Sequence, residues 1–145
     1  PLANGGTVVR PHLGLDVKGP GGSVVRTVNP PPARRLSINP ADLQTIRQGL
    51  HEAAQSPGGT SDDVMGSFPM AVYGKAGSAQ YINQRDYAWY AGFVIDHTDK
   101  PIVVVVRIEK AGFGNVAAAP VARQILSQWF FGKPGIYKPG ASSTL

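Results

Sequence analysis

The stretch from Met70 to Gln80 joins an apolar, β-prone run to residues that can bind an anion. Lys75 offers a fixed positive charge, and Ser78 offers a hydroxyl and a backbone N–H. Gly74 and Gly77 leave the backbone bare on either side of Lys75, which indicates that some group approaches the main chain closely. A charge, a hydroxyl and a free N–H together can hold a carboxylate and stabilise an acyl oxyanion. We therefore take Lys75 and Ser78 as candidate catalytic residues.

The stretch Lys75–Gln80 resembles the third active-site motif of penicillin-binding proteins, which is Lys-(Thr/Ser)-Gly on a strand, usually followed by Thr-Ala. Three further segments resemble the same family in the same order. Ala3–His12 resembles its Ala-Asn-Gly-Gly turn, Ala88–Phe93 the next strand, and Asn115–Ala122 the turn into the last helix. The chain thus looks like the C-terminal part of a class B transpeptidase domain, and the resemblance implies an α+β fold in which helices cover an antiparallel sheet.

The resemblance also implies roles for individual residues. Lys75 would shape proton transfer and attract the substrate carboxylate. The Ser78 hydroxyl would bind that carboxylate, and the Ser78 backbone N–H would complete an oxyanion hole. Gly77 would keep the approach to the strand open.

Three neighbours of these residues belong to the same expected substrate-binding region. Ala76 stands where the family usually has Thr or Ser, so one hydroxyl that could contact substrate is missing. Gln80 and Tyr81 are further candidates for the wall of the cleft.

The family's acylated serine lies in a Ser-x-x-Lys motif, and this motif does not occur in the 145 residues. The sequence also begins at Pro1 without a start methionine. We expect residues 1–135 to be the C-terminal portion of a transpeptidase domain, followed by a mobile tail at 136–145. The nucleophile would lie in an N-terminal portion, and this chain alone would not be competent in catalysis.

The implied activity is that of a serine-type D-Ala-D-Ala transpeptidase that cross-links peptidoglycan and is a target of β-lactams. Its expected partners are the stem peptide, the N-terminal portion with Ser-x-x-Lys and Ser-x-Asn, and a cell-wall polymerase complex. No cofactor is expected. The expected location is the extracytoplasmic face of the bacterial membrane, with an anchor upstream. Two alternatives stay open: a related serine β-lactamase or β-lactam sensor domain, and a non-catalytic interaction domain, which the alanine at position 76 favours.

The amino-acid composition excludes several classes of function. The chain has no cysteine, which excludes thiolate chemistry and disulfides, and 18 Gly with 13 Pro make it rich in loops. Its net charge of +5 is spread over scattered Lys and Arg, with Arg34-Arg35 as the one adjacent pair, so we expect a solvated surface and no nucleic-acid partner. No run approaches the ~20 apolar residues of a membrane span.

Other potential motifs favour structural roles. Ser37-Ile38-Asn39 matches the family's Ser-x-Asn in composition, but it follows the Ala-Asn-Gly-Gly turn instead of preceding it. Asn39 stands directly before Pro40, which is typical of a helix N-cap with Pro at the first helical position. Asp62-Asp63 has no nearby His, so we expect caps or solvated carboxylates and no metal site. His51 is expected to be a surface or packing residue.

The remaining pattern predicts the elements that position the site. Apolar spacing predicts a helix from Pro40 to Gln55. After the strand with Lys75, strands are predicted at Tyr87–Ile95 and Ile102–Ile108, joined by short turns into an antiparallel meander. The β-branched run of the last strand predicts burial on both faces. Trp89 and its neighbouring tyrosines are interpreted as core and sheet-face residues, although aromatic rings also stack on bases or sugars.

A last helix is predicted after Gly112, with its end at Gly132. Val121, Ile125 and Trp129 mark one apolar stripe on it, which Leu126 and Phe130 widen. We expect this helix to lie across the sheet as its main cover.

Overall fold

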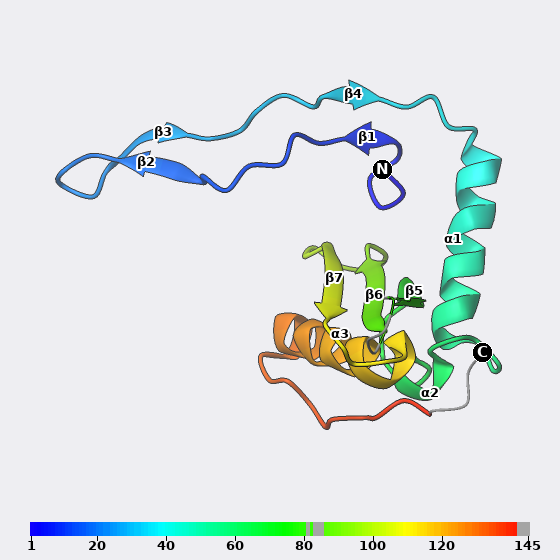
Figure 1. Ribbon diagram of the computed structural model, residues 1–145. Helices are drawn as coiled ribbons and strands as arrows, with labels where there is room; N and C mark the ends of the chain where they lie inside the picture. The colour runs from blue at the N-terminus through cyan, green and yellow to red at the C-terminus, as the bar shows by residue number, and fades with distance from the viewer. Residues whose placement is uncertain (81, 83–85, 142–145) are drawn as a thin grey trace. The chain divides into compact units, whose positions relative to one another are not determined.

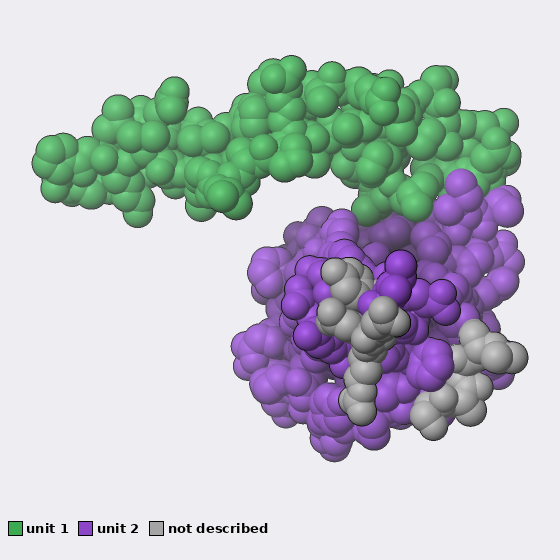
Figure 2. Space-filling model, viewed as in Figure 1, with its two compact units in different colours: residues 1–43 green, residues 44–145 purple. Residues whose placement is uncertain are grey.

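The computed structural model describes residues 1–80, 82 and 86–141. The chain divides into two compact units, Pro1–Leu43 and Gln44–Leu145, which Figure 2 shows in two colours. The boundary after Leu43 falls inside the first helix, α1 (Pro40–Gln55).

The first unit consists of short antiparallel strand pairs in extended chain (Figure 1). Strand β1 (Thr7–Val8) pairs with β4 (Arg34–Arg35), and β2 (Asp16–Lys18) pairs with β3 (Val24–Thr27). The hairpin between β2 and β3 turns at residues 19–22, which are rich in Gly and Pro, and the Gly22 N–H donates a hydrogen bond of 2.9 Å to the Gly19 carbonyl oxygen. Both strands of this hairpin are solvent-exposed along their length.

Helix α1 begins and ends where the sequence pattern placed it. The Asn39 Oδ1 atom accepts a hydrogen bond of 2.9 Å from the Ala41 N–H, which confirms Asn39 as the N-cap and gives it a structural role. At the other end, the Gln55 side chain connects the helix to the next segments. Its Nε2 donates to the carbonyl oxygens of Met65 (3.0 Å) and Phe68 (3.1 Å), and its Oε1 accepts from the Val72 N–H at 2.8 Å. These bonds hold the chain that leads into the sheet.

The sheet of the second unit is the predicted antiparallel meander. It contains β5 (Tyr73–Ala79), β6 (Tyr87–Val94) and β7 (Ile102–Ile108) in that spatial order, so β5 lies at an edge. Helix α3 (Gly114–Phe131) packs against all three strands and runs across them in Figure 1. An antiparallel sheet covered by helices confirms the predicted α+β class.

A short helix lies between α1 and the sheet. Helix α2 (Asp62–Met65) follows α1 and contacts α3. Val64 and Met65 are fully buried, so this turn closes one end of the core. The Asp62 carboxylate accepts a hydrogen bond of 2.8 Å from the Gly58 N–H, which is the kind of loop role expected for it.

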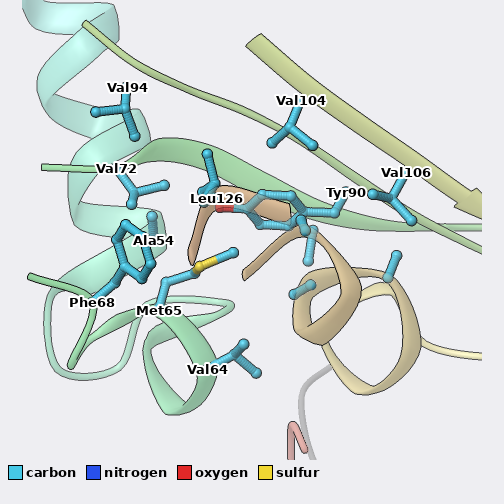
Figure 3. Packing of buried hydrophobic residues seen from close by; sticks show 14 of the residues in the cluster. Ala54, Val64, Met65, Phe68, Val72, Tyr90, Val94, Val104, Val106 and Leu126 are labelled. Atoms are coloured by element: carbon cyan, nitrogen blue, oxygen red, sulfur yellow. The ribbon is translucent and has the colours of Figure 1, made fainter. Parts of the chain in front are cut away.

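The core lies between the sheet and α3. Tyr90 is fully buried, and Figure 3 shows Met65 and Leu126 beside its ring. Val104 and Val106 extend the same face of the sheet along β7, and both are buried. Tyr90 is therefore a core residue, as predicted.

One prediction about burial was wrong, and a second was correct only in part. Strand β7 is not buried on both faces, because Val103 and Val105 are 61% and 60% exposed. Within the described residues, α3 covers only the side that carries Val104 and Val106, and side chains of a strand alternate between faces.

The predicted apolar stripe of α3 is correct for Val121, Leu126 and Phe130 but wrong for Ile125 and Trp129. Ile125 and Trp129 are 41% and 48% exposed, although the neighbouring Val121 and Phe130 are packed against the core. The face that meets the sheet carries Leu126 and the fully buried alanines Ala118, Ala119 and Ala122. Small side chains let the helix approach the strands closely, so the bulkier residues do not define the buried side.

No helix among the described residues has the length and apolar character needed to cross a bilayer.

Candidate active site

A groove with a volume of about 260 Å³ runs along the edge strand β5 at the first turn of α3. The residues that line it come from β5, from the loop before α2 and from the start of α3. They are Thr60, Lys75, Ala76, Gly77, Ser78, Phe113, Gly114 and Asn115. The groove therefore contains both candidate catalytic residues.

Lys75 and Ser78 reach this groove from different faces of β5. Side chains alternate along a strand, so residues three apart leave opposite faces. Lys75 lies opposite Ala91 and Ser78 lies opposite Ala88 on β6. The two side chains share one groove because β5 is at the edge of the sheet, where a ligand can touch both faces of the strand.

The Lys75 ammonium is exposed, and its Nζ donates a hydrogen bond of 2.8 Å to the Ala76 carbonyl oxygen. An ammonium has three N–H groups, so this bond uses one and leaves two for a ligand. The contact also fixes the end of a flexible side chain beside the strand.

The Ser78 hydroxyl oxygen accepts a hydrogen bond of 3.3 Å from the Gly114 N–H. Ser78 is exposed, so its side chain is open to solvent and ligands. Because the oxygen acts as the acceptor in this bond, the hydroxyl hydrogen stays available for donation to an anion.

The glycines of the site show where close approach occurs. A Cβ atom on Gly114 would lie 2.7 Å from the Gly77 nitrogen and closer still to the carbonyl oxygens of Gly77 and Trp89. A Cβ on Gly74 would lie 2.8 Å from Cζ of the Tyr90 ring. The close approach that the glycines predict is therefore made by α3 at Gly77 and by the buried Tyr90 ring at Gly74. By contrast, a Cβ on Gly77 would meet only the Trp89 Cβ, at 3.9 Å, so the space beside Gly77 is open.

The other predicted site residues differ in position. Ala76 is 8% exposed and lines the groove while it packs in the core, so a methyl group here avoids placing a hydroxyl in apolar surroundings. Gln80 is exposed just after β5 and is not among the residues that line the groove. Tyr81 lies outside the described residues.

Sequence reasoning missed Thr60, Phe113 and Asn115 as groove residues. Phe113 is 46% exposed at the rim, and Asn115 is 3% exposed in the first turn of α3. The run of glycines around Phe113 was a usable signal, because it precedes a helix whose first turn must meet the sheet closely. Nothing local in the sequence connects Thr60 with Lys75.

A polar cluster supports the beginning of β5, two residues before Lys75. The Tyr73 hydroxyl donates to the Asp96 carboxylate, and this hydrogen bond raises the pKa of Tyr73, with desolvation as a smaller cause. The Tyr73 ring stacks on Phe93 with centroids 5.2 Å apart, and it also meets the His51 ring. His51 Nδ1 lies 3.2 Å from the Val72 carbonyl oxygen, which makes it a packing residue as predicted.

Within the part of the chain that the structure describes, no group of His, Asp and Glu side chains could hold a metal ion. The polar side chains that line the groove are those of Lys75, Ser78, Thr60 and Asn115.

Residues 1–127 match the model of the family described as the penicillin-binding protein transpeptidase domain. The chain belongs to this family. A curated relative, peptidoglycan D,D-transpeptidase MrdA of Salmonella typhimurium, is 26% identical over 89% of the chain. The chain spans only 23% of that relative's length.

Solved structures show the same likeness. The structure of Pseudomonas aeruginosa PBP2 in complex with WCK 5153 aligns with 97% of the chain and 30% of its own length, at 28% identity and a TM-score of 0.71. Penicillin-binding protein A from M. tuberculosis, solved as an imipenem acyl-enzyme complex, aligns with 81% of the chain and 26% of its own length, at 28% identity and a TM-score of 0.60. The resemblance to class B penicillin-binding proteins is therefore confirmed.

Proposed function

We propose that this chain forms one wall of the acylation cleft of a serine-type peptidoglycan D,D-transpeptidase. The observation that carries the proposal is the shared groove of Lys75 and Ser78, in which a cation and a free hydroxyl hydrogen face the same space at a sheet edge. The names of the relatives agree with this activity, and one related structure is an acyl-enzyme with imipenem.

In the proposed reaction, a serine supplied by a Ser-x-x-Lys motif outside these 145 residues attacks the carbonyl carbon of the D-Ala-D-Ala peptide bond. The carbon–nitrogen bond breaks, D-alanine leaves with a proton on its amine, and an ester joins the stem peptide to the serine. An amine of a neighbouring stem then attacks the ester, forms the cross-link and releases the serine. Without that serine, the chain alone would not catalyse the reaction.

In this reaction, Lys75 and Ser78 would bind and stabilise negative charge on the substrate. The Ser78 hydroxyl donates to the terminal carboxylate of the stem, and the Lys75 ammonium attracts the same anion. Lys75 Nζ also reaches the Ala76 carbonyl oxygen at the free side of β5. Backbone groups two residues apart point to the same edge of a strand, so the Ser78 N–H faces that side as well. There it can stabilise the oxyanion together with the serine's own N–H.

The remaining assignments belong to the same proposal. The open space beside Gly77 would admit the substrate backbone, and Ala76 in the groove and the exposed Gln80 just after β5 stay candidates for substrate contact. The transpeptidase would work at the extracytoplasmic face of the bacterial membrane, anchored by a segment outside this chain. Its partners would be the stem peptide, the segment with the serine and a cell-wall polymerase complex.

The test is intact-mass measurement of the full-length protein after incubation with benzylpenicillin. We expect a mass increase of one penicillin, retained for hours, and peptide mapping should place it on a serine outside residues 1–145. Rapid loss of the adduct would favour a β-lactamase. Absence of any adduct would favour a non-catalytic domain, and an adduct on a serine within residues 1–145 would contradict the proposed division of the site.

A further inference from the structure

The chain that follows α3 folds back along the helix toward α2, as the orange and red segment of Figure 1 shows. It leaves the helix at Gly132, whose φ of 71° is the left-handed conformation that ends many helices. It passes Ser127 so closely that a Cβ on Gly135 would lie 2.7 Å from the Ser127 Oγ. We name residues 135–141 the strap.

Side chains of the second unit hold the end of the strap on both sides of one residue. The Asp63 carboxylate accepts a hydrogen bond from the Ala141 N–H. The Asn115 Nδ2 donates a hydrogen bond of 2.8 Å to the Ala141 carbonyl oxygen. One residue earlier, a Cβ on Gly140 would lie 2.6 Å from the carbonyl carbon of Asn115. Lys138 adds a third contact, with its Nζ 3.2 Å from the Ser67 Oγ. The predicted mobility of residues 136–145 stays a prediction, but the described part of this segment has defined partners.

The strap is connected to the groove through Asn115. This residue is 3% exposed and lies in the first turn of α3, directly after Gly114. The Gly114 N–H donates to the Ser78 hydroxyl, and the Gly114 backbone lies against Gly77. The first turn of α3 is therefore in contact both with β5 and with the strap.

We infer that Asp63 and Asn115 are positioning residues, which dock the strap on the first turn of α3 and thereby orient the Ser78 hydroxyl toward the substrate carboxylate. The inference rests on the proposed function, because it assigns a role to the same groove. Its physical basis is the buried Asn115 amide, which the strap supplies with an acceptor. Without the strap, this amide loses that acceptor, and the turn that carries the Gly114 N–H loses its contact with residues 140 and 141.

The first test is a double-mutant cycle in the full-length protein, read as the second-order rate constant of acylation by a fluorescent penicillin. Asp63→Ala should slow acylation about tenfold, whereas Asp63→Asn, which keeps an acceptor for the Ala141 N–H, should recover most of the rate. In a Ser78→Ala background, Asp63→Ala should change the rate less than twofold, because the hydroxyl it positions is absent. Equal slowing in both backgrounds would overturn the inference. Asp99→Ala, at an exposed turn carboxylate, is the matched control for charge.

The second test is hydrogen exchange at the Gly114 amide, which does not require any acylation. We expect exchange at least tenfold faster in Asp63→Ala and in Asn115→Ala than in the wild type, with the β6 and β7 amides unchanged. Unchanged exchange at Gly114 would overturn the inference even if the protein binds penicillin. Failure of the wild type to acylate, with the expected exchange result, would reject the proposed function and leave the docking of the strap intact.

Discussion

The Gly114 N–H donates a hydrogen bond to the Ser78 hydroxyl oxygen, over a distance of 3.3 Å. The two residues are far apart in sequence and meet because α3 begins directly over the edge strand β5. The bond leaves the Ser78 hydrogen free to donate, which is the arrangement that anion binding requires. Predictions about the site and its supports follow from this contact and from its neighbours.

Ser78→Ala should slow acylation of the full-length protein by a fluorescent penicillin about 30-fold. The reason is the loss of one hydrogen bond to a charged group, worth about 2 kcal/mol. Ser78→Thr keeps the hydroxyl and is the matched control, with a rate within a few-fold of the wild type. Ser78→Ala also removes the acceptor of the buried Gly114 N–H, so the alanine variant should lose about 1 kcal/mol of stability, and the rates are compared well below its unfolding temperature. Equal rates for alanine and threonine would exclude a role for this hydroxyl in ligand binding.

Gly114→Ala should destabilise the protein by about 3 kcal/mol in urea denaturation. The added methyl would enter space that the backbone of Gly77 and the Trp89 carbonyl oxygen occupy, so the helix and sheet must separate. Gly49→Ala is the contrasting variant. Gly49 is exposed in the interior of α1, and a methyl group added there would meet open space, so alanine should stabilise by up to about 1 kcal/mol. Tolerance of alanine at position 114 would show that the close packing is absent in solution.

Tyr73→Phe should lower stability by about 1 kcal/mol at pH 8, because the hydrogen bond to Asp96 is lost. The hydrogen bond raises the pKa of Tyr73 in the folded state above the ordinary value of 10.0. Its contribution is therefore complete below pH 10. As the pH rises through 10, the unfolded state releases its proton first, and stability falls until the pH passes the folded pKa.

The measurement is the urea midpoint of both proteins at pH 8 and at pH 11. The wild type should lose more stability over this interval than Tyr73→Phe, which has no phenol at this position to titrate. Tyr137→Phe removes an exposed tyrosine and is the control. A pH dependence that is identical in the wild type and Tyr73→Phe would show that the Tyr73 hydroxyl does not bind Asp96 in solution.

Tyr90→Phe should leave stability unchanged or raise it by up to about 1 kcal/mol. The Tyr90 hydroxyl is buried beside Ser61 without a hydrogen bond of ordinary geometry, and burial raises the pKa of Tyr90. Removing an unsatisfied polar atom from the core removes its desolvation cost. Thermal unfolding at pH 7 is the measurement. A loss above about 1 kcal/mol would mean that Ser61 or a water satisfies the hydroxyl.

Local signals in the sequence were sufficient to predict much of the fold. Asn39 followed by Pro40 predicted the start of α1, because capping depends on neighbours in sequence. The strand with Lys75 was predicted from its β-prone residues and glycines, and Lys75 and Ser78 do line one groove. That they share one groove although they leave opposite faces depends on the edge position of β5, which sequence alternation alone does not determine.

Other features depend on tertiary contacts. A run of valines has the same local pattern whether one or both faces are covered, so the exposure of Val103 and Val105 was not predictable from it. On α3, Ile125 and Trp129 were assigned to the core but are exposed, and buried alanines such as Ala118 and Ala122 share the buried face with Leu126. Thr60 and Phe113 reach the groove through loops whose course no periodic pattern describes.

The most direct test of the proposed acylation cleft is a crystal structure of the full-length protein after reaction with benzylpenicillin. The account predicts an ester to a serine outside residues 1–145, with the acyl carbonyl oxygen about 2.7–3.1 Å from the Ser78 nitrogen. The ligand carboxylate should lie in the groove, within hydrogen-bond distance of the Ser78 hydroxyl. A bound acyl group whose carboxylate and carbonyl oxygen lie away from β5, with Lys75 and Ser78 in contact with solvent alone, would contradict it.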